Sequence, residues 1–194
     1  MPARSFIAIK IECCFYRRQI VRLFAAIVLE KMNLRRKIKS LHQTLIKLYS
    51  YLENNKSIHE IIFSGGDPFI LDNSKLDFYL NAFSKLKQIK YIRFHTRILT
   101  CLPSRIDEEL IKILQQYSHL FQKVHFVIHS NHIDEWDEKS LKALQSLEKT
   151  SVELLSQFVL LKGVNDSSQT LEELIDFFIS HKIRPYYLHH PDKV

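Results

Sequence analysis

The fold of this chain is indicated by residues 60–68, Glu60-Ile61-Ile62-Phe63-Ser64-Gly65-Gly66-Asp67-Pro68. A short apolar run ends abruptly at two adjacent glycines, and the whole chain of 194 residues has only three glycines. Adjacent glycines let the backbone adopt positive φ values and approach a ligand closely, because no Cβ stands in the way. With the Asp67 carboxylate beside them, these peptide groups suit a small polar ligand that carries an ammonium group. A plain turn from a strand into a helix is the alternative interpretation.

From residue 58 onward, short apolar runs alternate with segments of helical period. The runs predict strands at Ile58–Phe63, Tyr91–Phe94, Val124–Ile128, Val152–Leu161 and Tyr186–Leu188. Between them, helix starts are expected at Asn73 or Ser74, Asp107, Asp134, and Ser168 or Thr170. Alternation of this kind predicts βαβ units, a parallel sheet and the α/β fold class.

Polar residues gather where the predicted strands end. The segments are Ser64-Gly65-Gly66-Asp67, His95-Thr96-Arg97, His129-Ser130-Asn131-His132, Lys162-Gly163-Val164-Asn165-Asp166 after the strand that holds Gln157, and His189-His190-Pro191-Asp192. In a (β/α) barrel the carboxyl ends of the strands converge on the active site. Five such ends in succession favour a shared site, although polar residues also favour turns in general.

Composition limits the class of protein. A chain of 194 residues with 46% hydrophobic residues can form one domain with a substantial core. No apolar run approaches the roughly 20 residues that span a bilayer, so no membrane association is expected. Three cysteines without a framework do not predict a disulfide scaffold, and a cytoplasmic location is the default expectation. No Cys-x-x-Cys pair predicts a metal site.

The net charge of +7 is concentrated in the N-terminal quarter. Residues 1–47 hold eleven Lys and Arg but two acidic residues, whereas the remainder holds 17 basic and 19 acidic residues. We therefore divide the chain into a basic segment of uncertain order, residues 1–47, and a partial (β/α) barrel, residues 48–194. A basic segment can bind nucleic acid or act as an Arg-rich transit peptide. No nucleic-acid motif continues into the body, so no nucleic-acid partner is expected.

Four segments together resemble the lysine 2,3-aminomutase family of radical S-adenosylmethionine enzymes. They are Ile-Ile-Phe-Ser-Gly-Gly-Asp-Pro at 61–68, His-Thr-Arg at 95–97, Val-Leu-Leu-Lys-Gly-Val-Asn-Asp at 159–166 and Pro-Tyr-Tyr-Leu-His at 185–189. They occur in the family's order and at compatible spacings over residues 48 to 194. The ending Leu-His-His-Pro-Asp-Lys-Val is most similar to the branch that makes β-lysine for elongation factor P.

The resemblance implies a radical S-adenosylmethionine (β/α) barrel, here partial and truncated at both ends, and three cofactors. A [4Fe–4S] cluster held by Cys-x-x-x-Cys-x-x-Cys would cleave S-adenosylmethionine to a radical. That radical would take a hydrogen atom from L-lysine held on pyridoxal phosphate, and the amino group would move from C2 to C3. In such enzymes the cofactors carry the difficult chemistry, and the protein binds, orients and excludes water.

The resemblance also implies residue roles. Ser64, Gly65, Gly66 and Asp67 would hold the methionine end of S-adenosylmethionine. The cleft for this cofactor would be lined by Gln157, His129, Asn131 and His132. Asp192 would pair with an ammonium group of lysine. Arg97 would meet a phosphate or carboxylate, with an ordinary surface salt bridge as the alternative.

The family's three-cysteine motif and its pyridoxal-phosphate lysine are missing, because Cys13 and Cys14 are adjacent and the sequence stops at Val194. If each codon begins at the third base of the preceding residue, Ile20-Val21, Phe24-Ala25 and Ile27-Val28 can encode cysteines at the required spacing. We hypothesise a frameshift before about residue 48. No catalytic residue is assigned. The leading interpretation is an aminomutase acting on L-lysine, followed by a non-catalytic remnant and, last, a basic nucleic-acid-binding protein.

Overall fold

The computed structural model describes residues 5–10, 41–64 and 66–190. Strands and helices alternate along the described chain, and from residue 58 onward this alternation was predicted from the sequence. In chain order they are β1 Ser5–Lys10, α2 Leu41–Asn54, β2 Ile58–Ser64, the 3-10 helix η1 Pro68–Ile70, α3 Asn73–Ser84, β3 Tyr91–Thr96, α4 Ile98–Cys101, η2 Pro103–Arg105, α5 Glu108–Ser118, β4 Lys123–His129, η3 Ile133–Glu135, α6 Glu138–Leu147, β5 Val152–Val159, α7 Ser168–Ser180 and β6 Arg184–His189.

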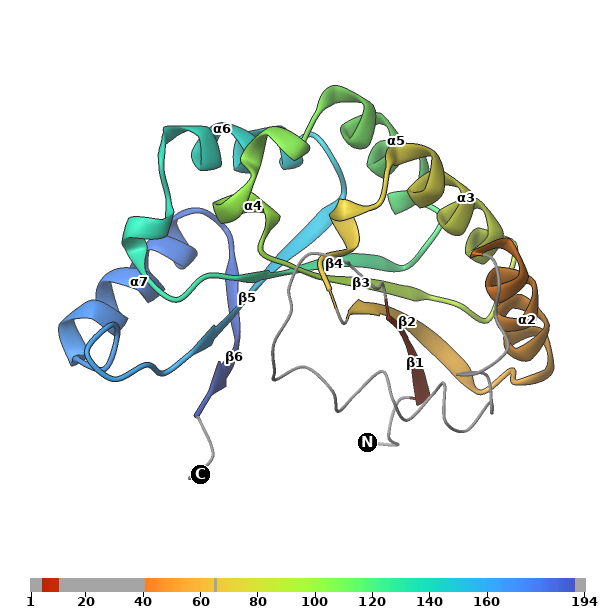
Figure 1. Ribbon diagram of the computed structural model, residues 1–194, viewed down its shortest axis with the longest axis horizontal. Coiled ribbons are helices and arrows are strands. Elements are labelled where there is room, and N and C mark those ends of the chain that lie inside the picture. Colours follow the sequence, from red (N-terminus) through yellow and green to blue (C-terminus); the bar gives the residue numbers. More distant parts are fainter. Residues whose placement is uncertain (1–4, 11–40, 65, 191–194) are drawn as a thin grey trace.

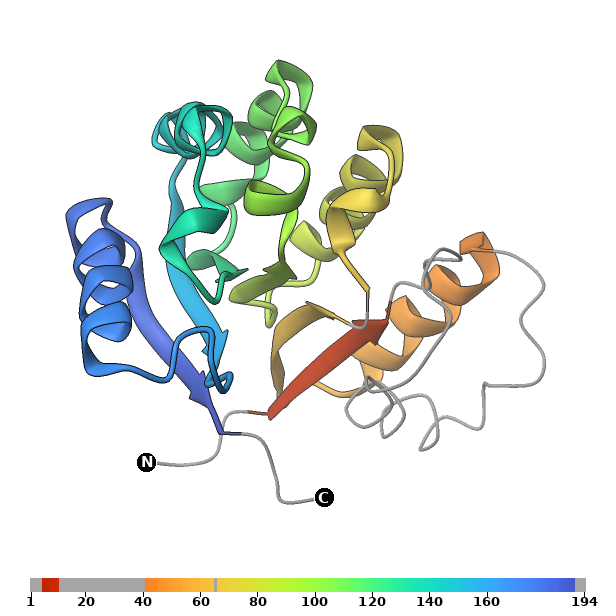
Figure 2. The same cartoon turned by 60° about the vertical axis from the view of Figure 1, so that its left-hand side comes forward.

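The six strands form one parallel sheet whose spatial order is the chain order, β1 to β6. The sheet is curved, and α2, α3, α5, α6 and α7 lie around its outer side (Figures 1 and 2). The two ends of the arc are β1 and β6, as Figure 2 shows. This is the α/β class predicted from the sequence, arranged as part of a (β/α) barrel.

The main core lies between the sheet and its outer helices. Phe63, Phe94 and Phe126 come from three neighbouring strands, and all are fully buried. Phe69, in η1, packs on two of them, with ring centroids 5.1 Å from Phe94 and 4.7 Å from Phe126. Because successive strand residues point to opposite faces, residues one position away from these phenylalanines point to the inner face.

Side-chain caps fix the helix starts. Asp72, Asp107 and Ser167 accept hydrogen bonds from the backbone N–H three residues on, at the starts of α3, α5 and α7. Such caps satisfy N–H groups that have no partner within the helix. The three starts agree with the sequence prediction to within one residue.

The predicted helix start at Asp134 is wrong. Residues Ile133–Glu135 form the short helix η3, and α6 begins at Glu138 with Asp137 as its cap. Trp136 separates the two helices: its indole N–H donates to the Ser130 hydroxyl at 2.9 Å, and its ring packs 4.9 Å from that of Phe177. This tertiary contact interrupts the helix and makes Trp136 a packing residue.

The sheet has one strand more than the five predicted after residue 58. The additional strand, β1, pairs in parallel with β2 from Ser5 to Lys10. At the other end of the sheet, β6 pairs with β5, and all six of its residues are exposed. In the described part of the chain, no helix has the length and apolar character needed to cross a bilayer.

Candidate functional site

The polar strand ends converge as predicted, because all six strands run in the same direction. His129 of β4 lies opposite Gln157 of β5, and Val159 of β5 lies opposite His189 of β6. On the other side, Phe63 of β2 lies opposite Phe94 of β3, just before the ends of both strands. The carboxyl edge of the sheet therefore carries a continuous row of polar groups on elements that a shared core holds rigid.

The turn after β2 combines an exposed glycine with a fully engaged carboxylate. Gly66 has a φ of 144°, which residues with a Cβ rarely adopt. Asp67 accepts hydrogen bonds from the backbone N–H of Phe69 and Arg97, at 3.1 and 2.7 Å, and from the Thr96 hydroxyl at 2.8 and 2.9 Å. The single Thr96 hydroxyl proton is shared between the two carboxylate oxygens, so three donors engage both oxygens. Asp67 therefore shapes the turn and ties it to β3.

His95 and Gln157 meet on the inner face of the sheet, although β4 lies between their strands. The His95 Nδ1 and the Gln157 Oε1 are 3.1 Å apart, and both side chains are half-buried. Burial and the positive charge of Arg93 lower the pKa of His95 to about 4. The imidazole is therefore neutral at pH 7. His95 belongs to the His-Thr-Arg segment of the sequence, whose pattern predicted no role for it.

A second polar cluster joins the ends of β4 and β5. Asn131 accepts from the Val159 N–H at 2.9 Å through Oδ1, and the same oxygen lies 3.2 Å from the His129 Nε2. The fully buried Asn165 donates from its amide to the backbone oxygens of Asn131 and Val159, and accepts from the Leu161 N–H. Asn131 thus connects two loops, and Asn165, for which the sequence predicted no role, completes this connection.

The two histidines of this segment differ. Burial, together with the nearby charge of Arg97, lowers the pKa of His129. His132 instead turns to its own loop, where its Nδ1 accepts from the Asp134 N–H at 3.2 Å. Of the two, His129 is the one that lies opposite Gln157 in the sheet.

Arg97 lies at the rim of the candidate site. Its Nη2 is 3.3 Å from Glu135 Oε2, and 44% of its side chain is exposed. The other Glu135 oxygen accepts from the Asn131 N–H at 2.9 Å. The salt bridge that was the alternative interpretation of Arg97 is therefore present. It occupies only part of a guanidinium group that has five N–H donors, so Arg97 can also meet an anion.

Deeper on the inner face, a buried ion pair links three strands. Arg93 of β3 donates to Glu60 of β2 at 2.5 and 3.0 Å, and their side chains are 15% and 6% exposed. The same guanidinium donates to the Tyr186 hydroxyl of β6 at 3.1 Å and lies 5.5 Å from the centre of that ring. Tyr186 therefore reaches across the concave side of the sheet beneath the candidate site.

Several predicted residues lie outside the described part of the chain. They are Gly65, Asp192, Cys13 and Cys14. Among the described residues the free cysteine is Cys101, which is exposed, and no three His, Cys, Asp or Glu side chains are grouped to hold a metal ion. The described residues therefore do not fit a [4Fe–4S] cluster. The exposed glycine turn and the polar strand ends do fit a small polar ligand.

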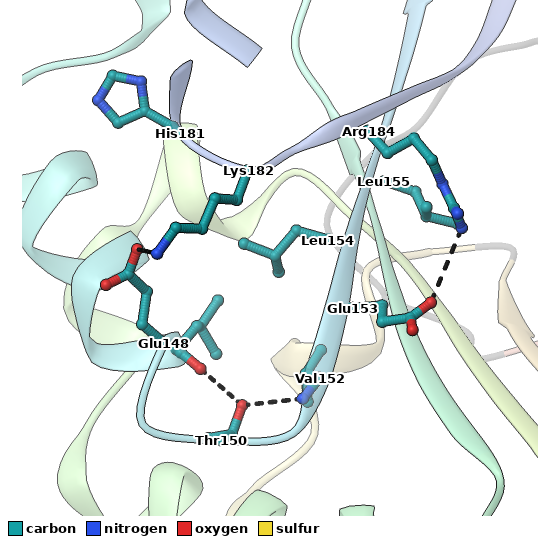
Figure 3. Close-up of a pocket in the computed structure, with 10 residues that line it drawn as sticks. Glu148, Thr150, Val152, Glu153, Leu154, Leu155, His181, Lys182 and Arg184 are labelled. Atoms are coloured by element: carbon teal, nitrogen blue, oxygen red, sulfur yellow. Dashed lines mark hydrogen bonds and ion pairs between the residues drawn. The ribbon is translucent and has the colours of Figure 1, made fainter. Parts of the chain in front are cut away.

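A separate pocket lies at the opposite ends of the strands (Figure 3). It is lined by residues at the starts of β5 and β6, where Lys182 faces Glu148 at 3.5 Å and Arg184 faces Glu153 at 3.7 Å. Exposed ion pairs of this kind contribute little to stability. Since active sites of (β/α) barrels lie at the carboxyl ends, this pocket is not the candidate site.

The chain is similar to several curated proteins, although no family model matches it. It is 33% identical over 191 residues to the L-lysine 2,3-aminomutase of Methanococcus maripaludis, an alignment that covers 98% of this chain and 42% of the relative. It is 38% identical over 144 residues to the enzyme of the same name from Buchnera aphidicola, and 37% over 144 residues to that from Escherichia coli. These two alignments cover 74% of this chain, and 42% and 41% of the relatives. The chain thus spans about two fifths of the length of these relatives.

Proposed function

The chain belongs to the L-lysine 2,3-aminomutase family, and from this premise we propose that it provides the S-adenosylmethionine-binding barrel of an isomerase that converts L-lysine to β-lysine. The similarity to relatives of that name is the observation that carries the proposal. The arrangement of the site supports it, because the polar strand ends meet at the edge where barrel enzymes bind their ligands.

The turn after β2 would hold the methionine end of S-adenosylmethionine. Its members would be Ser64, Gly65, Gly66 and Asp67. Because three donors already engage the two Asp67 carboxylate oxygens, the ligand's ammonium group would meet mainly backbone carbonyl groups of the turn. Asp67 would keep that turn in place, and the absence of a Cβ at Gly66 would allow close approach.

The next strand ends would form the wall of the cofactor cleft. Gln157 and His129 lie side by side on β5 and β4. Asn131 would hold the loop that carries His132. A neutral His129 is a hydrogen-bonding group without charge, so it would not repel the sulfonium of S-adenosylmethionine.

Two charged residues would recognise the lysine substrate and the phosphate group of pyridoxal phosphate. Arg97 would take a carboxylate or phosphate, which its exposed guanidinium allows. Asp192, outside the described residues, would pair with an ammonium group of lysine. The β-lysine product would be used to modify elongation factor P. This expectation rests on the last seven residues, which resemble the family branch that makes β-lysine for that factor.

A complete enzyme also needs a [4Fe–4S] cluster and pyridoxal phosphate, which together supply the radical chemistry when bound. No set of described residues fits the cluster. We propose that a shift of reading frame before about residue 48 removed the cluster cysteines. The alternative is a non-catalytic remnant that keeps the barrel and its ligand site. The DNA around codons 20 to 48 separates an altered frame from an original one.

The proposal is tested by binding of S-adenosylmethionine to the 194-residue chain in equilibrium dialysis. Gly66→Ala should weaken binding at least roughly tenfold, since a Cβ would occupy the turn at an unfavourable φ. Gly163→Ala is the matched control: its φ is 73°, and a Cβ there would meet nothing within 4 Å. Equal loss in both variants, or no binding by the unmodified chain, would count against the site.

Two further measurements separate the classes of function. Iron and acid-labile sulfide, measured after anaerobic reconstitution, should be absent from the remnant and present in an enzyme. A titration with oligonucleotides at several salt concentrations tests the basic segment as a nucleic-acid-binding element.

A further inference from the structure

His95 and Gln157 form a hydrogen bond across an intervening strand, and its direction can be derived. The contact joins the His95 Nδ1 to the Gln157 Oε1 at 3.1 Å. An amide oxygen only accepts, so the imidazole nitrogen must carry the proton. The bond therefore requires the Nδ1–H form of His95.

The surroundings keep this imidazole neutral, so it has a single N–H. Burial and the charge of Arg93 both disfavour the imidazolium, and His129 and His189 act in the same direction. A neutral imidazole with its proton on Nδ1 has no proton on Nε2, which becomes an acceptor. Meanwhile the Gln157 amide oxygen is engaged, and its NH₂ group must turn away from His95.

We propose that His95 is a positioning residue, which fixes the Gln157 carboxamide so that its NH₂ group faces the ligand at the carboxyl edge of the sheet. The inference rests on the proposed function, because it assigns the ligand of Gln157 to the S-adenosylmethionine cleft. The pair thus offers the ligand one donor, the Gln157 amide NH₂, from which a hydroxyl or carboxylate of the ligand can accept.

A purely structural role of His95 would give a different pattern of effects when this residue is substituted. If the bond served only to tie β3 to β5, any residue that kept the sheet intact would be tolerated. The ladder between these strands does not need it, because β3 pairs with β4 over six residue pairs and β4 with β5 over six. Losing the side-chain bond should therefore leave the sheet folded and change the orientation of Gln157.

The tautomer is measured first, without ligand. Long-range ¹H–¹⁵N NMR of the ¹⁵N-histidine-labelled chain distinguishes a protonated from an unprotonated ring nitrogen, and loss of signals in His95→Asn assigns the residue. The expected result at pH 7 is a proton on Nδ1 only. A proton on Nε2 would mean that the Gln157 amide is turned the other way, and it would overturn the inference.

Two variants then test positioning. His95→Asn places an amide N–H near the former Nδ1 and should keep the affinity for S-adenosylmethionine within about twofold. His95→Gln places its amide near the former Nε2, and should weaken binding roughly three- to tenfold, the effect of one lost hydrogen bond. The exposed His119, which bonds to its own helix, supplies the control His119→Gln. Thermal melts verify that all three variants fold.

The outcomes separate the two proposals. An Nδ1–H tautomer without S-adenosylmethionine binding would leave the His95–Gln157 geometry intact but contradict the proposed function. Binding of S-adenosylmethionine by a chain whose His95 has the Nε2–H tautomer would support the proposed function but contradict the positioning role of His95. Equal affinity in His95→Asn and His95→Gln would show that His95 does not position Gln157 for this ligand.

Discussion

The Thr96 hydroxyl donates to the Asp67 carboxylate, with its Oγ1 2.8 and 2.9 Å from the two carboxylate oxygens, and this contact joins the end of β2 to the end of β3. The Arg97 N–H adds a third contact between these ends, at 2.7 Å. Asp67, which the sequence motif predicts to bind a ligand, therefore also joins the ends of two neighbouring strands.

Replacing Asp67 with Asn should destabilise the chain by about 1.5–3 kcal/mol, because an amide NH₂ would face the N–H donors that the carboxylate now satisfies. Urea unfolding followed by circular dichroism measures the change. Asp134→Asn is the matched control, since the Asp134 side chain is 87% exposed, and it should change stability by less than about 0.5 kcal/mol. Similar values for the two variants would show that the Asp67 contacts contribute little.

The buried pair of Glu60 and Arg93 gives a larger expected effect. Glu60→Gln removes the charge and leaves the guanidinium buried with a neutral partner, which should cost about 3–5 kcal/mol. The exposed pair of Glu138 and Lys142, at 2.6 Å, provides the control: Glu138→Gln should cost under about 0.5 kcal/mol. A Glu60→Gln chain as stable as the original would contradict the assigned importance of this pair.

Asn165→Ala should destabilise the loops after β4 and β5. It leaves the Leu161 N–H and the backbone oxygen of Asn131 without their partners, at a cost of about 1–3 kcal/mol for each unsatisfied buried group. Hydrogen exchange of the Leu161 amide should accelerate. Asn81→Ala, at an exposed helical position, is the control, and faster exchange in that variant as well would point to global instability instead.

Stability should fall on mild acidification, in part through His95. Its pKa is about 4 in the folded chain against an ordinary 6.5. Between these values the unfolded chain binds a proton that the folded chain does not, so stability is complete above pH 6.5 and is lost as the pH falls toward 4. From pH 7.5 to pH 5.0, His95→Asn should lose about 2 kcal/mol less than the original chain.

The matched control for this pH dependence is His119→Asn, at an exposed position. It should retain the original acid sensitivity. His125 and His129, whose pKa values burial also lowers, remain in both variants, so some loss of stability persists. An unchanged pH dependence in His95→Asn would mean that this imidazole titrates normally.

Most of the fold was predictable because its signals are local. The apolar runs and the capping residues Asp107 and Ser167 depend on neighbours a few positions away, so strands and helix starts follow from the sequence. The start of α6 was misplaced, because Trp136 is held by Ser130 and Phe177. Only the folded chain brings Phe177 to that position.

The candidate site was predictable as a location, and less so as a set of contacts. Strand ends identify the edge, and the parallel sheet brings His129 beside Gln157. Nothing in the spacing of His95 and Gln157 shows that their side chains meet across β4. Similarly, the engagement of Asp67 by Thr96 depends on the register of two strands, which the sequence pattern does not specify.

The agreement between strand order in space and strand order along the chain has a consequence for synthesis on the ribosome. From β2 to β6, each strand pairs with the one made just before it, so no pairing has to wait for a distant segment to emerge. Vectorial folding, in which each new unit docks on the last, is therefore open to this sheet. The last described strand, β6, leaves all its residues exposed, so its docking depends on backbone pairing with β5 and on the contact between Tyr186 and Arg93.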